Sequence, residues 1–334
     1  MTNVLVTGAN GQLGSEICDL VGGLGEAALG CAPLGAPDDV DESSGEAEAT
    51  HPEAALGCAP LGAPDSGDNI FHFTNSSTLD ITDFSKVKEF IETHNINAII
   101  NCAAYTAVDK AEDDEVNADK INHLAVKNLA TIAKEKNIKL IHISTDYVFD
   151  GKNYKPYRED DTTNPNGIYG ATKLAGENAM IGINPSNSII IRTSWVYSSF
   201  GANFVKTMLR LGKERDSLGV IFDQVGTPTY ARDLARAILE ILPQLVGGAP
   251  SDVQIYNYSN EGVCSWYDFA KEIMRMAKIE CRVNPIETKE YPTPATRPHY
   301  SLLNKLKIKE EFGITISYYK DSLDECLQKM GERK

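Results

Sequence analysis

The feature that most restricts the fold of this chain is a glycine-rich turn that joins a strand to a helix near the start of the sequence. Residues 3–7 (NVLVT) have the composition of a buried strand, and residues 12–20 have the pattern of a helix. Between them, Gly8 permits a tight turn, Gly11 lets another group approach the backbone, and Gly14 allows the helix to pack closely. A strand, such a turn and a helix form the opening unit of a parallel α/β sheet.

The alternation of strand and helix continues along the chain. We predict further strands at 70–73, 98–101, 139–144 and 188–192, and helices at 84–94, in a long segment that ends near Lys136, and around Tyr169. Alternation of this kind places parallel strands side by side with helices on both faces. The predicted fold class is therefore α/β, a Rossmann-like doubly wound parallel sheet.

The glycine-rich turn also has the character of a phosphate site. Its backbone N–H groups open a helix, whose N-terminal end favours an anionic pyrophosphate. The spacing G-x-x-G-x-x-G after a strand and before a helix predicts a dinucleotide cofactor. The predicted contacts lie in the turn, at the adenine edge and on the nicotinamide side: Gly8, Gly11, Gln12, Leu13 and Gly14, then Asp80 and Ile81, then Ala103, Ala104 and Tyr105.

The choice between NADPH and NADH stays open. An acidic residue about 20 positions after the turn usually binds the ribose of NAD, but Asp38 lies in a segment with no strand pattern. The expected second strand ends in Thr74 and Asn75, which provide neither that carboxylate nor an arginine for the phosphate of NADP. For Asp80 a second role is open, as the cap of the helix predicted at 84–94.

An acid/base unit is predicted downstream, where Tyr169 and Lys173 lie one helical turn apart after a strand that ends in Thr145. A phenol, whose usual pKa is about 10, is a poor acid or base near neutral pH unless a nearby cation stabilises its anion. Lys173 supplies that charge from position i+4, and Thr145 is placed to hold a substrate oxygen against the phenol. These side chains predict hydride transfer to or from a carbonyl.

The Tyr-x-x-x-Lys spacing occurs a second time, at Tyr267 and Lys271. This copy lies at the start of an amphipathic helix at 265–277 and follows no strand that ends in a hydroxyl residue. We interpret it as ordinary packing, because the spacing alone carries little information.

The final third of the chain is less regular. It mixes two helices, a strand and a proline-rich loop, at 203–214, 265–277, 255–258 and 291–294. We predict a dinucleotide-binding domain over 1–190 and a smaller substrate-binding domain made mainly of 191–334, part of which returns to the sheet.

Residues 22–68 form an acidic segment rich in Gly, Ala and Pro. They contain ten acidic residues and no Lys or Arg, whereas the rest of the chain carries 37 acidic and 32 basic residues. A 13-residue block, EAALGCAPLGAPD, occurs at 26–38 and again at 53–65. We expect an insertion that is dispensable for fold and catalysis, although its leucines leave a partner-binding role open.

The composition excludes several classes of protein. The net charge of -15 argues against a nucleic-acid partner. No apolar run approaches the roughly 20 residues that span a bilayer, and the chain starts directly with its first strand, so we expect a cytoplasmic protein without a membrane partner. The seven cysteines are scattered, which predicts free thiols and no structural zinc.

Six ordered segments resemble one family. They read TGANGQLG from Thr7, NCAAYTAVDKAE from Asn101, STDYVFDG from Ser144, YGATKLAGE from Tyr169, RTSWVY from Arg192 and YPTPATRP from Tyr291. Outside 22–68 they span nearly the whole chain and are similar to the dTDP-4-dehydrorhamnose reductases, which are extended short-chain dehydrogenases. The resemblance implies that NADPH or NADH reduces the 4-keto group of dTDP-4-dehydro-L-rhamnose to dTDP-L-rhamnose, in nucleotide-sugar synthesis for surface polysaccharide.

The resemblance also implies roles for individual residues. Tyr169 would protonate the C4 oxygen of the sugar as hydride arrives. Lys173 would bind the nicotinamide ribose and lower the pKa of Tyr169, and Thr145 would orient the sugar.

Further contacts are implied for the substrate. Asp146 and Trp195 would contact the sugar nucleotide, and Arg297 its pyrophosphate. Burial in the core stays open for Trp195, as does a surface ion pair for Arg297. Family members also use magnesium, often at a homodimer interface. Glu16 lies near the matching place, but one carboxylate does not make a site, and we predict no metal ligand.

Two other functions share this fold. Sugar-nucleotide dehydratases and epimerases are the nearest relatives in chemistry, and the dehydratases resemble this chain except that an acidic pair follows the threonine. Here Tyr147 stands at the place of the second carboxylate, which favours a reductase. The other alternative is a non-catalytic relative, the regulatory subunit of methionine adenosyltransferase, which keeps the nucleotide site as a binding module.

Overall fold

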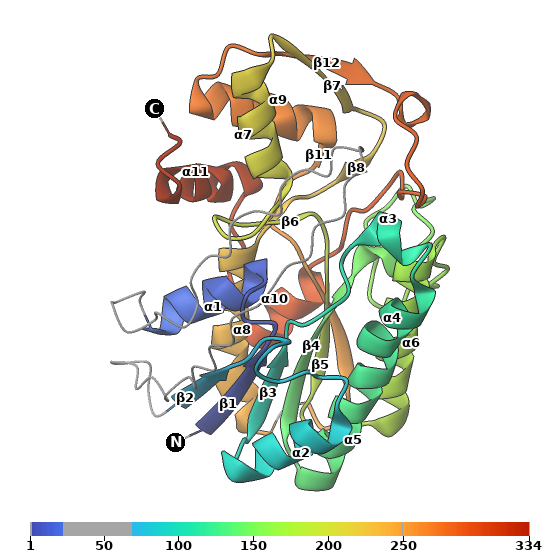
Figure 1. Cartoon of the computed structure of the whole chain (residues 1–334), viewed down its shortest axis with the longest axis vertical. Helices are drawn as coiled ribbons and strands as arrows, with labels where there is room; N and C mark the ends of the chain where they lie inside the picture. The colour runs from blue at the N-terminus through green and yellow to red at the C-terminus, as the bar shows by residue number, and fades with distance from the viewer. Residues whose placement is uncertain (1, 23–68, 249, 334) are drawn as a thin grey trace, which may run out of the picture.

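The structure, a computed structural model, describes residues 2–22, 69–248 and 250–333. The predictions for the acidic segment, for its duplicated block and for Asp38 fall outside the described residues, apart from Gly22. In the described chain, a sheet with its flanking helices forms one layered body, and a lobe of helices and short strands lies above it (Figure 1).

Six strands form one sheet in the order β10-β5-β4-β3-β1-β2, and all neighbours are parallel. Their bounds are β1 Thr2–Thr7, β2 Asn69–Phe73, β3 Ala98–Asn101, β4 Lys139–Thr145, β5 Ile189–Thr193 and β10 Gln254–Tyr258. The predicted Rossmann-like sheet is confirmed. After β2 the chain returns to the other side of β1, and sheets of this kind bind ligands at such a switch point, beyond the carboxyl ends of the strands.

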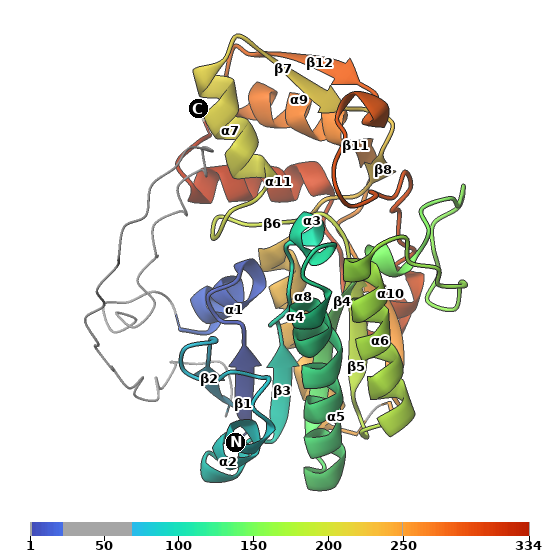
Figure 2. The ribbon, with the colours of Figure 1, turned by 45° about the vertical axis from the view of Figure 1, so that its right-hand side comes forward.

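Successive residues of β1 face opposite sides of the sheet. Val4 and Val6 belong to a core cluster with α1 and α8, whereas Leu5 belongs to a second cluster with α2 and α5. All three side chains are fully buried, as expected for a parallel strand that is covered on both faces. Figure 2 shows α5 and α6 in front of the sheet and α8 behind it.

The helices that cover the sheet are α1 Gln12–Gly22, α2 Phe84–Thr93, α5 Ala125–Lys136, α6 Ile168–Ile183, α8 Ala231–Val246 and α10 Leu306–Phe312. After β3 the chain forms α3 Val108–Ala111 and α4 Glu115–Asp119, and a π-helix at Lys120–Leu124 joins α4 to α5. The prediction of a long helix that ends near Lys136 is confirmed at that end, where Asn137 takes a left-handed φ of 54°.

The upper lobe has an apolar core of its own, which includes Phe269 and Leu323. Its helices are α7 Phe204–Glu214, α9 Trp266–Ala277 and α11 Tyr319–Lys329, and its longer strands are β7 Ser217–Ile221 and β12 Arg282–Ile286, which pair with each other. Short strands connect it to the sheet: β6 Val196–Tyr197, β8 Val225–Gly226, β9 Thr229–Tyr230 and β11 Cys264–Ser265. Single turns of 3₁₀-helix occur at Asp146–Val148 and Thr288–Glu290.

Two long helices, α8 and α11, are absent from the sequence prediction. Both carry a helical pattern of buried apolar residues, such as Leu234, Ile238 and Ile241 in α8. Pro243 near the end of α8 makes that pattern harder to recognise. The predicted division into 1–190 and 191–334 stays a prediction.

Two features of the described residues bear on the class of protein. None of their helices is both long and apolar enough to cross a membrane. Cys102, Cys264, Cys281 and Cys326 are free thiols, and burial raises the pKa of Cys102, Cys264 and Cys326 to about 12 in each case.

Candidate active site

In the glycine-rich turn between β1 and α1, backbone atoms pack so closely against Gly8 and Gly14 that neither position has room for a side chain. Gly8 has a left-handed φ of +66°, and a Cβ there would lie 2.7 Å from the backbone nitrogen of Ala103. A Cβ on Gly14 would meet the backbone oxygen of Gly8 and lie 2.7 Å from Cα of Ala9. The glycines therefore bring α1 and the end of β3 close to the turn, which leaves its exposed backbone available to a pyrophosphate.

Replacing Gly14 with Ala is expected to weaken NADPH binding by about tenfold or more, because overpacking of this kind costs roughly 1–3 kcal/mol and displaces the turn. Fluorescence titration of the cofactor measures the change. Gly182→Ala is the matched control, since that glycine also lies in a helix but has no atom within 4 Å of an added methyl group. Equal dissociation constants for both variants would contradict the assignment of the turn.

The other predicted cofactor residues lie around the same edge of the sheet. Gln12 opens α1, and its buried Oε1 has no hydrogen-bond partner among the described residues. Tyr105 is fixed by its backbone N–H, which donates to Asn122 Oδ1 at 2.9 Å, and by its hydroxyl, which donates to Asp114 at 3.0 Å. Leu13 is buried, and Ala103 and Ala104 are half-buried. The turn and Gln12 fit a dinucleotide, because a tight glycine cradle and an unpartnered polar atom lie side by side.

One role considered for Asp80 is wrong. The cap of α2 is Asp83, whose side chain accepts from the backbone N–H of Lys86. Asp80 instead accepts from the backbone N–H of Thr82 at 2.9 Å, a local turn that lowers the pKa of the carboxyl. The sequence could not separate the two aspartates, because both stand just before the helix. Asp80 is exposed and Ile81 is buried, and their cofactor contacts stay predictions.

The start of α6, the helix that carries Tyr169, is fixed by a side chain from another part of the chain. The carboxylate of Glu112 accepts from the backbone N–H of Ile168 at 3.0 Å, at the first residue of α6. A Cβ on Gly167 would lie 2.5 Å from that carboxylate, and a Cβ on Gly170 would collide with the backbone oxygen of Tyr147. These contacts hold the start of α6 against the end of β4, where Thr145 lies.

Thr145 and Tyr169 meet at the end of β4. Thr145 is 5% exposed, and its hydroxyl donates to Asp146 at 3.0 Å. Tyr169 is half-buried, and burial raises the pKa of its phenol to about 12, although hydrogen bonding by Thr145 opposes the rise. The phenol is therefore neutral near pH 7 and has a proton to donate.

Lys173 is almost fully buried, at 1% exposure. Its Nζ donates to the backbone oxygen of Ile143 at 2.6 Å and lies 3.4 Å from Nε2 of His142. Burial lowers the pKa of Lys173 to about 8, and the carboxylate of Glu177 opposes that change. The lowering of the Tyr169 pKa that the family resemblance implies for Lys173 stays a prediction.

Asp146 is a buried carboxyl beside this pair. It is 3% exposed, and burial raises its pKa to about 6. Ser301 opposes the rise, yet neither Asp146 Oδ2 nor Ser301 Oγ makes a hydrogen bond of normal geometry within the described residues. A buried carboxyl oxygen without a partner is costly in a folded protein and is common where a ligand or water binds.

The backbone of Trp195 is strained, and the side chain of Arg297 is held in an ion pair. Trp195 has a left-handed φ of 51° and stacks on Trp266 with ring centroids 3.6 Å apart. Arg297 forms a two-pronged ion pair with Asp109, at 2.9 and 2.6 Å. A left-handed tryptophan costs energy and is typical of functional sites, whereas Arg297 has the ion pair that the sequence left as an alternative. Their substrate contacts stay predictions.

The second Tyr-x-x-x-Lys copy lies in a different environment. Tyr267 lies in the first turn of α9 and packs against the core of the upper lobe, and Lys271 is exposed, in contrast to the buried Lys173. Ser265 and Asp268 form a capping box that explains the start of α9. The surroundings of this copy agree with its interpretation as packing.

A buried ion pair that the sequence did not predict lies beside the strand that ends in Thr145. Glu177 on α6 is fully buried and accepts from Arg192 Nε at 3.0 Å and from Nη2 at 2.7 Å. The hydroxyl of Ser144, which precedes Thr145, also donates to Glu177. Arg192 and Glu177 each lie in a segment that resembles the family. Only the structure shows that they pair between β5 and α6.

The residues around Glu16 do not fit a magnesium ion. This carboxylate is fully buried and accepts from Ser198 at 2.6 Å, from Lys329 at 3.0 Å and from Arg232 at 3.1 Å. The same two cations also bind Asp19. Positive charge is thus already supplied by side chains, and no cluster of three metal-binding side chains occurs in the described part of the chain.

Reductase activity is consequently expected to survive removal of divalent cations. Treatment with a chelator should change the rate by less than about twofold, because the Glu16 carboxylate is already paired with Arg232 and Lys329 and does not bind a metal ion. The comparison needs the same enzyme with and without added magnesium. A rate that collapses with chelator and recovers with magnesium would contradict this reading of Glu16.

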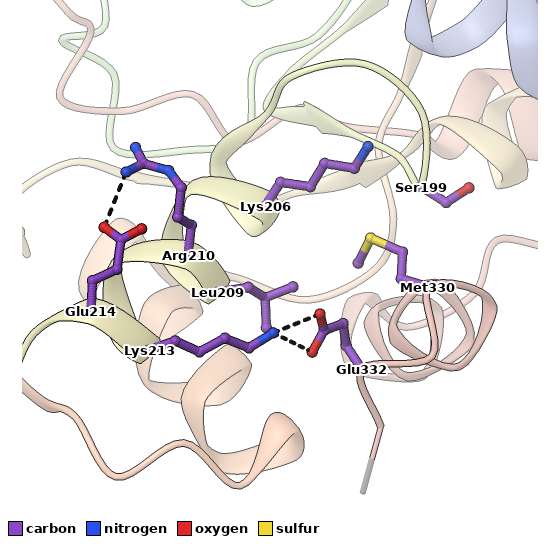
Figure 3. A pocket seen from close by; sticks show the side chains of 8 residues that line it. All are labelled: Ser199, Lys206, Leu209, Arg210, Lys213, Glu214, Met330 and Glu332. Carbon is purple, nitrogen blue, oxygen red and sulfur yellow. Dashed lines mark hydrogen bonds and ion pairs between the residues drawn. The ribbon is translucent and has the colours of Figure 1, made fainter. Parts of the chain in front are cut away.

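A surface cleft of about 570 Å³ lies between α7 and the end of α11 (Figure 3). It is lined by Ser199, Lys206, Leu209, Arg210, Lys213, Glu214, Met330 and Glu332. Arg210 pairs with Glu214 and Lys213 pairs with Glu332. No predicted site residue lines this cleft, so it is separate from the Tyr169 site.

The fold and the site define the class of protein: a nicotinamide-dependent oxidoreductase of the short-chain dehydrogenase type, with a glycine-rich cofactor turn and a Thr-Tyr-Lys unit at the carboxyl edge of the sheet. Comparison with known proteins gives the family. The model of the RmlD substrate binding domain matches residues 1–332. The chain belongs to the dTDP-4-dehydrorhamnose reductase family.

Individual relatives agree with that assignment. A dTDP-4-dehydrorhamnose reductase of Aggregatibacter actinomycetemcomitans is 43% identical over 253 residues, which cover 74% of this chain and 86% of the relative. A crystal structure of a dTDP-4-dehydrorhamnose reductase from Clostridium acetobutylicum is 37% identical, with a TM-score of 0.80 over 99% of this chain and 100% of the other. The Bacillus anthracis enzyme, solved in complex with NADP, is 32% identical, with a TM-score of 0.80 over 98% and 99% of the two chains.

Proposed function

We propose that this protein reduces the 4-keto group of dTDP-4-dehydro-L-rhamnose with NADPH or NADH, giving dTDP-L-rhamnose for surface polysaccharide. The observation that carries the proposal is that Thr145 and Tyr169 meet at the end of β4, while the buried Lys173 bonds to the same strand, at the edge of the sheet that also carries the glycine-rich turn. Membership of the reductase family supports the substrate, and the NADP complex of a relative supports the cofactor.

The family resemblance gives the proposed roles, and the geometry of the site supports them. A bound reduced nicotinamide supplies the hydride. Tyr169 gives its proton to the C4 oxygen, Thr145 holds that oxygen by a hydrogen bond, and Lys173 binds the cofactor ribose. The turn residues and Gln12 hold the pyrophosphate, and Asp146 and Trp195 contact the sugar.

The environment of Tyr147 favours a reductase over a dehydratase. Its ring meets the ring of Tyr169 edge-on, with centroids 5.4 Å apart, at the place where a dehydratase would need a second carboxylate. Burial raises the pKa of Tyr147 above its usual value, so this phenol stays neutral. A neutral phenol cannot replace a carboxylate as the base of an elimination.

The test is to incubate the protein with NADPH and dTDP-4-dehydro-L-rhamnose and to follow the loss of reduced-nicotinamide absorbance, with product analysis. A parallel reaction with dTDP-glucose tests the dehydratase alternative, which is favoured if a 4-keto-6-deoxy sugar appears. Tight NADPH binding without turnover of either sugar would favour the binding-module alternative.

The remaining proposals concern location and assembly. We propose a cytoplasmic enzyme, supported by the free thiols of Cys102, Cys264, Cys281 and Cys326, which suit a reducing compartment. A homodimer is the assembly that the family resemblance allows, and light scattering tests it. The acidic net charge of -15 supports a protein that does not bind nucleic acid.

A further inference from the structure

A chain of buried polar side chains connects the cofactor turn to Lys173. Thr7 ends β1, Asn101 ends β3 and His142 lies within β4, and each is at most 1% exposed. Thr7 Oγ1 donates to Asn101 Oδ1 at 2.7 Å, and Asn101 Nδ2 lies 3.0 Å from His142 Nδ1. The other ring nitrogen of His142, Nε2, lies 3.4 Å from Lys173 Nζ.

The direction of these hydrogen bonds follows from the contacts of Thr7, next to the glycine-rich turn. The backbone N–H of Ala103 donates to Thr7 Oγ1 at 3.4 Å, and the Thr7 hydroxyl in turn donates to Asn101 Oδ1. The amide of Asn101 is thereby oriented with its NH₂ group toward His142. An amide NH₂ group donates and cannot accept, so Nδ1 of His142 accepts, and a neutral imidazole must carry its proton on Nε2.

The ring of His142 is neutral near pH 7. Burial, followed by the charge of Lys173, holds the pKa of His142 well below its usual value. The Nε2–H group therefore faces the nitrogen of Lys173. A donor in that position disfavours the ammonium form of the lysine and favours the amine, whose lone pair can accept the hydrogen bond.

We propose that Thr7, Asn101 and His142 are positioning residues that lower the proton affinity of Lys173. The proposal rests on the proposed function, in which Tyr169 is the proton donor, and it adds that Lys173 supplies the proton that Tyr169 regains. After Tyr169 has given its proton to the substrate oxygen, an N–H bond of Lys173 breaks and the O–H bond of Tyr169 forms again. His142 Nε2–H then donates to the amine that remains, and Lys173 regains a proton from solvent after the product has left the site.

Other groups also act on the charge of Lys173. The carboxylate of Glu177 on α6 raises the pKa of Lys173, and Glu177 itself is bonded to Arg192 on β5. Tyr169 lies one turn away on the same helix. Substitutions at Thr7 leave all of these groups and the burial of Lys173 unchanged, so they isolate the effect of the hydrogen-bonded chain.

The first test is the tautomer of His142 in the wild-type protein without cofactor. Nitrogen-15 shifts of histidine-labelled protein distinguish a protonated from an unprotonated ring nitrogen, and His142→Gln assigns the signal. We expect the proton on Nε2. A proton on Nδ1, or a ring protonated at pH 7, overturns the proposal without the need for any variant to remain folded.

The second test compares Thr7→Val with Thr7→Ser. Carbon-13 shifts of the lysine Cε report the titration of Lys173, assigned with Lys173→Met. In Thr7→Val the freed Asn101 amide can turn and let Nε2 accept from the ammonium group, so the ammonium-to-amine ratio at a fixed pH should rise about tenfold. Thr7→Ser keeps the hydroxyl and should titrate like wild type.

An unchanged or smaller ratio in Thr7→Val overturns the proposal, as does a Thr7→Ser protein that behaves like Thr7→Val. Both measurements are made without substrate. A wild-type protein that fails to reduce the dTDP-4-dehydro sugar would count against the proposed function alone, because the tautomer and the titration would still show whether the chain acts on Lys173.

Discussion

Tyr169→Phe is expected to lower turnover by about 10²- to 10⁴-fold, the usual effect of removing a positioned general acid. The phenol is neutral near pH 7, because burial raises its pKa to about 12, and it faces Thr145 at the end of β4. The substitution removes one hydroxyl and keeps the ring that packs edge-on against Tyr147. Steady-state rates with NADPH and the dTDP-4-dehydro sugar measure the loss.

The matched control is Tyr267→Phe, because Tyr267 has the same spacing to a lysine, but that lysine, Lys271, is exposed. We expect this control to retain wild-type turnover and both variants to bind NADPH within about threefold of wild type, since neither hydroxyl lies in the glycine-rich turn. Turnover of Tyr169→Phe within a few-fold of wild type would show that another group donates the proton.

Arg192→Met is expected to lower the free energy of unfolding by about 3–5 kcal/mol, because it leaves the Glu177 carboxylate charged and unpaired in the interior. Glu177 is fully buried and the Arg192 side chain is 3% exposed, so water cannot replace the lost bonds. The guanidinium also bonds the backbone oxygen of Glu159 and lies over the ring of Phe149. Urea-induced unfolding measures the change.

Arg210→Met is the control for this prediction. Arg210 and Glu214 form an ion pair in which both side chains are about half exposed, at 49% and 53%, so we expect a loss below about 1 kcal/mol. Adding Glu177→Gln to Arg192→Met should restore part of the stability, because it removes the unpaired charge. A loss as small as that of Arg210→Met would mean that the buried pair adds little to the fold.

Much of the fold was predictable because its signals are local. The strand at 98–101 was predicted with the bounds that the structure gives, and the helix after the glycine-rich turn begins at Gln12 as expected. Alternating strands and helices then require a parallel sheet covered on both faces. The helices α8 and α11 carry comparable patterns and could have been predicted from them.

The partners of the site residues were not predictable from spacing. Asp83 rather than Asp80 caps α2, and Arg297 pairs with Asp109, which lies far away in the sequence. The sequence offers many combinations of such charges, and only the packed chain selects one. For the same reason Glu16, which the family resemblance associates with magnesium, proves to be neutralised by Arg232 and Lys329.

The sequence by itself determined the α/β class and predicted the glycine-rich turn and the Thr-Tyr-Lys unit, since each signal lies in a strand, a turn or a helix that the local pattern reveals. The tertiary structure alone decided the charge states around that unit. Tyr169 is neutral and Lys173 holds its proton weakly because burial removes water from both. His142 and Asn101 reach Lys173 only because β3 and β4 are neighbours in the sheet. Burial and contacts between strands arise when the whole chain has packed, so no local pattern encodes them.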